Sequence, residues 1–265
     1  MKQTKPGGGQ TESLYRLLSI ASPLFFLLLW EGAVRLGWLD YRFFPPPSTV
    51  LTYFVRLLFS GELWNHLSIS LLRILAGFAL GTLPAVILGL LMGWFRLFHA
   101  LFDPLVAATY PVPKIALLPL FLIWFGLGET TKIATIAVAV FFVVLITTVN
   151  GVRQIDPVLI EAGQSYGARG WRLFQKVILP ATLPAIFTGL RLGLGVALLV
   201  IVGAEFVASN RGIGYLIWIS WSTLAVNKMY VGLITISLLG LLSTWGLEQL
   251  RRRLMPWAED FHGPR

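Results

Sequence analysis

Residues 156–184 read DPVLIEAGQSYGARGWRLFQKVILPATLP, a polar and basic segment between two long apolar runs. The pattern predicts two short helices joined by a bend. Asp156 can cap the first helix, and Pro157 suits its first position because no backbone N–H is needed there. Gly167 can end this helix, because the left-handed conformation costs glycine little.

The second helix of this segment is expected over residues 171–177. Gly170 permits the turn that precedes it. Pro180 and Pro184 are expected to end it ahead of the next apolar run, because proline lacks the N–H that a helix interior uses.

The composition indicates a chain whose solvent is lipid. It has 265 residues, of which 56% are hydrophobic and 12% charged, whereas soluble domains carry about 25% charged residues. The net charge of +9 does not indicate a nucleic-acid partner, because the basic residues lie between apolar runs rather than on one soluble face. No cysteine is present and the three histidines lie far apart in sequence, so no metal site is expected.

The apolar runs predict an all-α integral membrane protein with about six transmembrane helices. Basic residues precede the first apolar run, as they do in a signal peptide. The run continues past Glu31 and no cleavage signal follows, so we interpret it as a retained membrane helix. We expect spans within residues 14–36, 70–95, 105–125, 133–149, 186–207 and 229–247 of one domain over 14–257. Around them we expect a disordered tail over 1–13, an interfacial amphipathic helix over 49–59, a re-entrant or interfacial piece over 216–221 and a C-terminal tail over 258–265.

A stripe of small residues follows one face of the second expected span. Its members recur at every fourth position: Gly77, Gly81, Ala85, Gly89 and Gly93. Small residues at this spacing let another helix approach closely. The stripe therefore predicts a helix-packing face, although glycine is also simply common in membrane helices.

The third expected span is dense in proline and contains Pro111, Pro113 and Lys114. Such a helix must bend or break, and irregular backbone at membrane depth is tolerated only against protein or a water-filled path. This segment is the expected translocation pathway. For Lys114 we leave open a role in the path or snorkelling of its amine to the headgroups. Glu205 either lines the path or forms a structural pair with Arg211 near the outer surface.

The distribution of basic residues orients the chain. Thirteen lie on one expected side: Lys2, Lys5, Arg16, Arg96, Arg153, Arg169, Arg172, Lys176, Arg191, Arg251, Arg252, Arg253 and Arg265. Seven lie on the other: Arg35, Arg42, Arg56, Arg73, Lys132, Arg211 and Lys228. The positive-inside rule then places residues 151–184 and both termini in the cytoplasm, and the Arg251–Arg253 run is expected to stop the last span.

Glu161-Ala162, Gly167 and Leu179-Pro180 resemble the EAA loop of permease subunits of bacterial ABC importers. Gly163 departs from the alanine of that pattern, and Val177 from its isoleucine. Other pieces look like the nitrate/sulfonate/taurine branch of the family. They are Phe44–Ser48, Gly61–Trp64, Trp124–Gly126, Ala204-Glu205 and Arg251–Trp257.

The resemblance implies a type I ABC importer permease fold, in the bacterial inner membrane, with the loop docked on an ATPase subunit. The docking residues it implies are Glu161, Ala162, Gly163, Tyr166, Gly167, Arg172, Leu179 and Pro180. It further implies a homodimer, two ATPase subunits, a periplasmic or lipid-anchored binding protein, and contact with membrane lipid. The implied cargo is a small anion such as a sulfonate, taurine, nitrate or bicarbonate, and the alternative cargo is a neutral or heterocyclic nutrient. The alternative protein class is a secondary transporter.

The chain has no G-x-x-x-x-G-K-[ST] segment that could cradle the phosphates of ATP. We therefore expect no cofactor on this chain, with ATP and Mg²⁺ held by the partner ATPase, and no catalytic residue.

Overall fold

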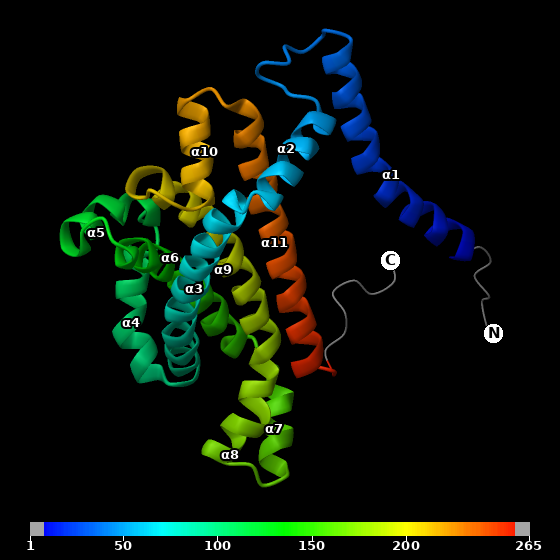
Figure 1. Ribbon diagram of the computed structural model, residues 1–265. Helices are drawn as coiled ribbons and strands as arrows, with labels where there is room; N and C mark the ends of the chain where they lie inside the picture. The colour runs from blue at the N-terminus through cyan, green and yellow to red at the C-terminus, as the bar shows by residue number, and fades with distance from the viewer. Residues whose placement is uncertain (1–7, 258–265) are drawn as a thin grey trace. The chain divides into compact units, whose positions relative to one another are not determined.

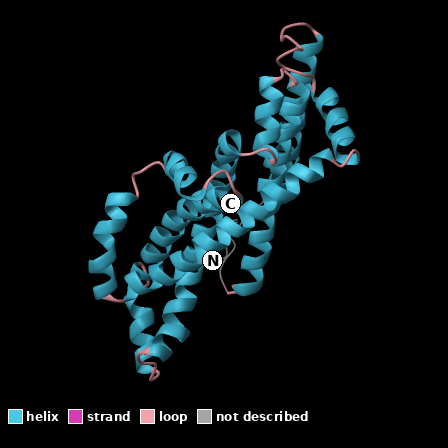
Figure 2. Cartoon of the chain, turned by 60° about the vertical axis from the view of Figure 1, so that its left-hand side comes forward, coloured by secondary structure: helices cyan, strands magenta, loops and turns pink. Residues whose placement is uncertain are grey.

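The computed structural model describes residues 8–257, and in that range Figure 2 shows helices and connecting loops without strands. Figure 1 shows their course. The elements in chain order are α1 (Gly8–Arg35), α2 (Pro47–Phe59), α3 (Glu62–Trp94), α4 (Arg96–Thr109), η1 (Lys114–Leu117), α5 (Leu118–Phe125), α6 (Glu129–Arg153), α7 (Pro157–Ser165), α8 (Trp171–Leu173), η2 (Phe174–Ile178), α9 (Leu179–Ala208), α10 (Ile213–Ser222) and α11 (Val226–Leu254). The all-α membrane class predicted from composition is confirmed.

Four helical stretches are long and apolar enough to cross a membrane: α3, α6, the continuous run of residues 171–208, and α11. A fifth is possible if α4 and the η1–α5 piece, which meet at 86°, form one broken span. The expected break in the proline-rich segment is therefore confirmed. The expected count of six, which also needs α1, stays a prediction.

The chain divides into two compact units, which we describe separately: residues up to 63 with 219–231, and residues 64–218 with the remainder. In the first unit, α1 supplies the N-terminal cap that α2 lacks. The carboxylate of Glu31 accepts hydrogen bonds from the backbone N–H of Ser48 at 3.0 Å and its hydroxyl at 2.7 Å. This contact explains a carboxylate at the end of an apolar run, since it satisfies helix-end donors that no other group reaches.

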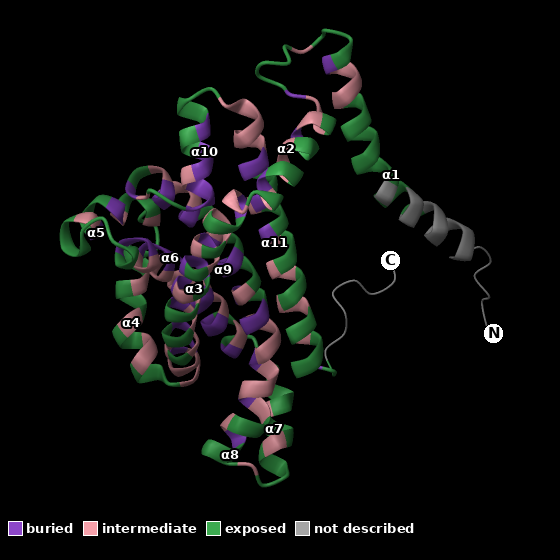
Figure 3. Cartoon of the chain, in the orientation of Figure 1, coloured by how far each residue is buried: buried purple, intermediate pink, exposed green. Residues whose placement is uncertain are grey.

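The second unit is built around α6. Ile136, Val140 and Val144 are fully buried, and α3 and α9 pack on different faces of this helix. Along α3 the small-residue stripe allows this approach: a Cβ at Gly77 would lie 2.6 Å from Ile136, and one at Gly93 would lie 2.5 Å from Val152. Figure 3 shows the buried residues gathered on α6 and the faces of its neighbours.

Gly189 and Gly193 of α9 make the same kind of approach to α6, against Thr147 and Val144. Gly195, two positions beyond Gly193, lies off this packing face, because a Cβ there would meet nothing within 4 Å. Residues 193 and 195 differ by about 200° around a helix, so both cannot face α6.

Several boundaries differ from the sequence-based expectation. α9 continues through Pro180 and Pro184 instead of beginning after them, because a π-helical turn over 174–178 precedes it and Pro180 falls in its first positions. α4 begins at Arg96 and carries Pro104 inside. Arg251–Arg253 form the last turn of α11 rather than follow it.

At the ends of the chain, residues 8–13, expected in a disordered tail, form the start of α1. The rest of that tail and the expected C-terminal tail over 258–265 lie outside the described residues.

The closest approach along the stripe gives a first expected result. Gly81→Ala should lower the apparent unfolding temperature of the purified protein, since the added Cβ would overlap the backbone carbonyl of Ala137. Overpacking of this kind costs about 1–3 kcal/mol. The larger side chain of Gly81→Leu should prevent α3 and α6 from packing together. Gly195→Ala is the matched control, because its Cβ enters open space. Equal stability of both variants in detergent would show that α3 and α6 do not pack this closely.

Candidate functional site

The segment from Asp156 to Ile178 forms a helical hairpin that projects from one end of the second unit, at the bottom of Figure 1. The carboxylate of Asp156 accepts a hydrogen bond from the Val158 N–H at 2.9 Å, which confirms the predicted cap. Gly167 has φ +82°, and the N–H of Ala168 reaches the carbonyl of Gly163 at 3.0 Å. This is the left-handed helix end that glycine favours, so the predicted bend is confirmed.

A small apolar core fixes the base of the hairpin to α6 and α9. Val152, Ile155 and Ile178 are buried together, and Ile160 and Phe174 of the hairpin pack on them. Because the second leg runs without a break into α9, the hairpin is held as a rigid extension of the bundle.

The two departures from the EAA pattern touch one another. A Cβ at Gly163 would lie 2.7 Å from a methyl group of Val177 and 3.1 Å from Leu173. The smaller residue at each position therefore lets the two legs of the hairpin pack closely, which explains a glycine inside a short helix despite its low helix propensity.

The hairpin exposes several apolar and aromatic side chains among its polar ones, although it lies beyond the apolar part of the bundle. The exposed fraction is 93% for Tyr166, 67% for Trp171 and 65% for Val158, and Figure 3 shows most of the hairpin exposed. Of the residues expected to dock, the structure exposes Glu161, Ala162, Tyr166, Gly167 and Arg172 on the hairpin. Gly163 lies between its legs, and Leu179 and Pro180 lie at its base, half-buried.

The proline-rich segment breaks between α4 and η1, and Lys114 holds the break. Its ammonium group donates hydrogen bonds to the carbonyls of Thr109 at 2.7 Å, Tyr110 at 3.0 Å and Val112 at 2.8 Å. It also lies 4.2 Å from the ring centroid of Phe142. The Thr109 carbonyl also accepts from the Val112 N–H at 3.2 Å, and the ammonium group adds a charged donor to all three carbonyls at this helix end. The side chain therefore folds back on the break.

This geometry sets an expected result for Lys114→Met. Three carbonyls lose a charged donor, which should destabilise the break by about 1–3 kcal/mol and lower both the unfolding temperature and transport. Lys114→Arg should keep part of both, since the charge remains. Arg96→Met, which removes an exposed charge at the other end of α4, is the control. Wild-type stability and transport in Lys114→Met would mean that the amine supports neither.

Glu205 lies at the opposite end of α9 from the hairpin, about 39 Å from Leu179 at 1.5 Å per residue. Its side chain is fully buried. The carboxylate accepts hydrogen bonds from Ser70 at 2.8 Å, from Arg73 at 2.7 Å and from the Gly214 N–H at 2.8 Å. The expected pairing with the Arg211 side chain is wrong, because the salt-bridge partner is Arg73.

Arg73 connects this carboxylate to a second one. Its guanidinium contacts both oxygens of Glu129, with a 2.6 Å bond from Nη2, and also donates to the carbonyl of Arg211 at 2.8 Å. Lys132 lies 3.5 Å from Glu129. We call Ser70, Arg73, Glu129, Lys132 and Glu205 the buried charge cluster, of which Glu129 alone is half-exposed. Its two cations and two carboxylates balance.

The turn after α9 is shaped by this cluster. Gly212 has φ +123°, and a Cβ there would overlap the Glu205 carboxylate. A side chain at Gly214 would lie 2.8 Å from the Cβ of Glu205. Two glycines therefore let the backbone wrap a buried carboxylate and supply an N–H to it.

Sequence reasoning missed Arg73 as a functional candidate, since we counted it among the outer basic residues. A signal was present, because an arginine inside an apolar run requires a partner at membrane depth. In the described part of the chain, no group of three or more His, Cys, Asp or Glu side chains could hold a metal ion.

Comparison with known proteins matches residues 85–256 to the model of a family described as binding-protein-dependent transport system inner membrane component. The aliphatic sulfonates transport permease protein SsuC of Bacillus subtilis is 36% identical over 91% of this chain and 87% of its own length. The taurine transport system permease protein TauC of Escherichia coli is 37% identical, over 91% and 89%. The riboflavin transport system permease protein RibX of Chloroflexus aurantiacus is 35% identical, over 88% and 87%.

Proposed function

The chain belongs to the binding-protein-dependent transport system inner membrane components, and from this premise we propose that it carries a small organic sulfonate. It is the multi-pass permease subunit of an ABC importer. The observation that carries the proposed cargo is that relatives named for aliphatic sulfonates and taurine match about nine-tenths of the chain at 36–39% identity.

The helical hairpin is the proposed docking element for the ATPase. Exposed Tyr166, Trp171 and Val158 form an apolar surface beyond the membrane-spanning helices, and such a patch on an otherwise polar segment favours a protein partner. Exposed Glu161 and Arg172 supply charges at the rim of that contact. ATP and Mg²⁺ would be held by the ATPase, and this chain would contribute no catalytic group.

We further propose a homodimer, because two copies would offer two hairpins to two ATPase subunits. Each hairpin would act as a lever. Its second leg is continuous with α9, and α9 ends at the buried charge cluster. A displacement of the hairpin during ATP hydrolysis would therefore reach the opposite end of the bundle through one helix rather than through a flexible linker.

We also propose that the hairpin and both termini lie in the cytoplasm, and this orientation can be tested directly. The chain lacks cysteine, so single cysteines report sidedness. Ser165→Cys on α7 and Leu51→Cys on α2 should react with an impermeant thiol reagent from opposite faces of the membrane. The Leu51 side chain is exposed, and its replacement leaves the contact between Ser48 and Glu31 in place. Labelling of both from one side would overturn the orientation.

Transport measurements test the cargo. The complex of this chain with its ATPase, reconstituted in liposomes with the binding protein, should import taurine or a short alkanesulfonate in an ATP-dependent manner. Riboflavin is the comparison substrate, because one relative is named for it. ATP-dependent uptake of riboflavin without uptake of any sulfonate would replace the proposed cargo while leaving the permease assignment intact.

A further inference from the structure

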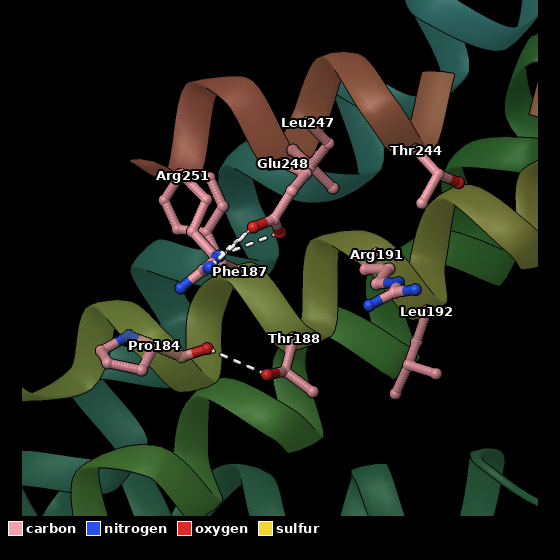
Figure 4. Close-up of a pocket in the computed structure, with 9 residues that line it drawn as sticks. All are labelled: Pro184, Phe187, Thr188, Arg191, Leu192, Thr244, Leu247, Glu248 and Arg251. Atoms are coloured by element: carbon pink, nitrogen blue, oxygen red, sulfur yellow. Dashed lines mark hydrogen bonds and ion pairs between the residues drawn. The ribbon is translucent and has the colours of Figure 1, made fainter. Parts of the chain in front are cut away.

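A cavity of about 290 Å³ lies between α9 and α11 in the second unit, and none of its lining residues belongs to the hairpin or to the buried charge cluster. Figure 4 shows the residues that line it. Its apolar wall is formed by Phe187, Leu192 and Leu247. Its polar atoms come from two threonines and three charged residues: Thr188, Thr244, Arg191, Glu248 and Arg251. The volume is near the lower limit of about 300 Å³ for small-molecule sites, which suits a ligand of few atoms.

Arg191 is the residue of this cavity whose side chain indicates a bound ligand. It lies near the middle of α9, within the membrane span expected over residues 186–207, about 18 Å along the helix from Leu179 and about 21 Å from Glu205. Among the described residues, its guanidinium has no ion pair or hydrogen bond, and the residue is exposed. A charged side chain in a membrane span is costly unless it meets a partner or a water-filled path.

Among the described residues that line the cavity, Glu248 is the one carboxylate, and it is already neutralised. Arg251 donates to Glu248 at 2.6 Å and 2.9 Å, and Arg252 donates to it at 3.4 Å. In Figure 4 the Arg251–Glu248 contact lies beside Arg191 without including it. Glu248 therefore already has its cationic partners, and Arg191 is not one of them.

We propose that this cavity binds the oxyanion head group of the cargo during transport, with the Arg191 guanidinium as its principal ligand. The planar guanidinium matches two oxygens of a sulfonate in a bidentate contact. The Thr244 hydroxyl, which lines the same cavity, can donate to a third oxygen, and the apolar wall accommodates a short organic chain. The identity of the anion rests on the proposed function, whereas the existence of an oxyanion site rests on Arg191 and the cavity.

The test uses the full chain purified with its ATPase and the variant Thr188→Cys, whose position is exposed and three residues before Arg191 on the same helix face. The sulfonatoethyl and trimethylammonioethyl methanethiosulfonates differ in charge and react with the same thiol. The anionic reagent should react faster than the cationic one, relative to a free thiol, by on the order of tenfold. Taurine should slow the reaction.

Adding Arg191→Gln should abolish the preference for the anionic reagent and the protection by taurine, and Arg191→Lys should keep part of both. Arg253→Gln is the matched control, since it removes an exposed positive charge at the end of α11 but does not line the cavity. In liposomes, Arg191→Gln should reduce taurine uptake by about tenfold or more, while ATPase co-purification and basal ATP turnover stay at wild-type values.

The remaining outcomes separate the sources of the anion. Protection by added phosphatidylglycerol and not by taurine would identify the ligand as a lipid phosphate and overturn the cargo site. An equal rate for both reagents in Thr188→Cys, or an unchanged preference after Arg191→Gln is added, would overturn the oxyanion site itself. If Thr188→Cys shows the anionic preference but the wild-type complex imports no sulfonate, the site stands and the proposed cargo is wrong.

Discussion

Replacing Arg73 by methionine is expected to prevent recovery of the folded complex. Glu205 has no exposed surface and Glu129 is half-exposed, and both lose their guanidinium partner. Breaking a buried ion pair by removing one partner costs about 3–5 kcal/mol, because the remaining charge is left without compensation. This is a large fraction of the stability of a typical domain. The measurement is the yield of monodisperse protein in detergent and its apparent unfolding temperature.

Two further variants make this prediction specific. Arg211→Met removes the cation that we first expected to pair with Glu205, and it should be almost neutral because only its backbone carbonyl enters the cluster. The double variant Arg73→Met/Glu205→Gln should be less destabilised than the sum of its single changes, because no uncompensated charge remains at position 205. Normal stability of Arg73→Met, or a large effect of Arg211→Met, would show that the cluster is not arranged as described.

The second large effect is expected in the helical hairpin. Gly167→Val should abolish ATPase association, since φ at this position is +82° and a β-branched side chain adopts that conformation only with strain. The helix end would rearrange and turn Glu161 and Tyr166 away from the docking surface. Gly167→Asn is the matched control and should retain association in part, because asparagine tolerates the left-handed region. Co-purification of the ATPase measures the effect.

Glu161→Lys should give the same loss by a different route. Glu161 is exposed on α7, so reversal of its charge leaves the fold intact and acts only on the docked partner. The reversal sets like charges against each other at the interface, which costs several kcal/mol and is therefore more than tenfold in affinity. Gln175→Lys, which places a lysine on the other leg, is the control. Both Glu161→Lys and Gly167→Val should insert into the membrane normally.

ATP turnover in liposomes, with and without loaded binding protein, completes this test. Normal association and normal stimulated turnover in both variants would mean that the hairpin does not couple the ATPase to transport. The family assignment would stand in that case, but the lever mechanism would not.

The sequence by itself determined the features that depend on local chemistry. The low charge content indicated a lipid environment, and the cap at Asp156 and the left-handed end at Gly167 followed from positions within a few residues of one another. The break near Pro111 and Pro113 was predictable for the same reason. These features rest on backbone conformations that single residues allow or forbid.

Helix ends were less predictable where the local signal was weak. Pro180 looked like a helix end, but a π-helical turn before it lets one helix continue from residue 171 to residue 208. The stripe of Gly77 to Gly93 indicated that some helix packs on α3, but not which one. Its partner, α6, begins more than thirty residues later in the chain.

Only the tertiary structure decided the partners of the buried charges. Arg73 and Glu205 are separated by 132 positions in sequence, and no local pattern distinguishes Arg73 from Arg211 as the cation for that carboxylate. The free energy of a buried charge depends on which groups the fold brings within hydrogen-bond distance and on how far water is excluded. The same is true of Arg191, which reads in sequence as one basic residue among many and faces a cavity only because α11 packs beside α9.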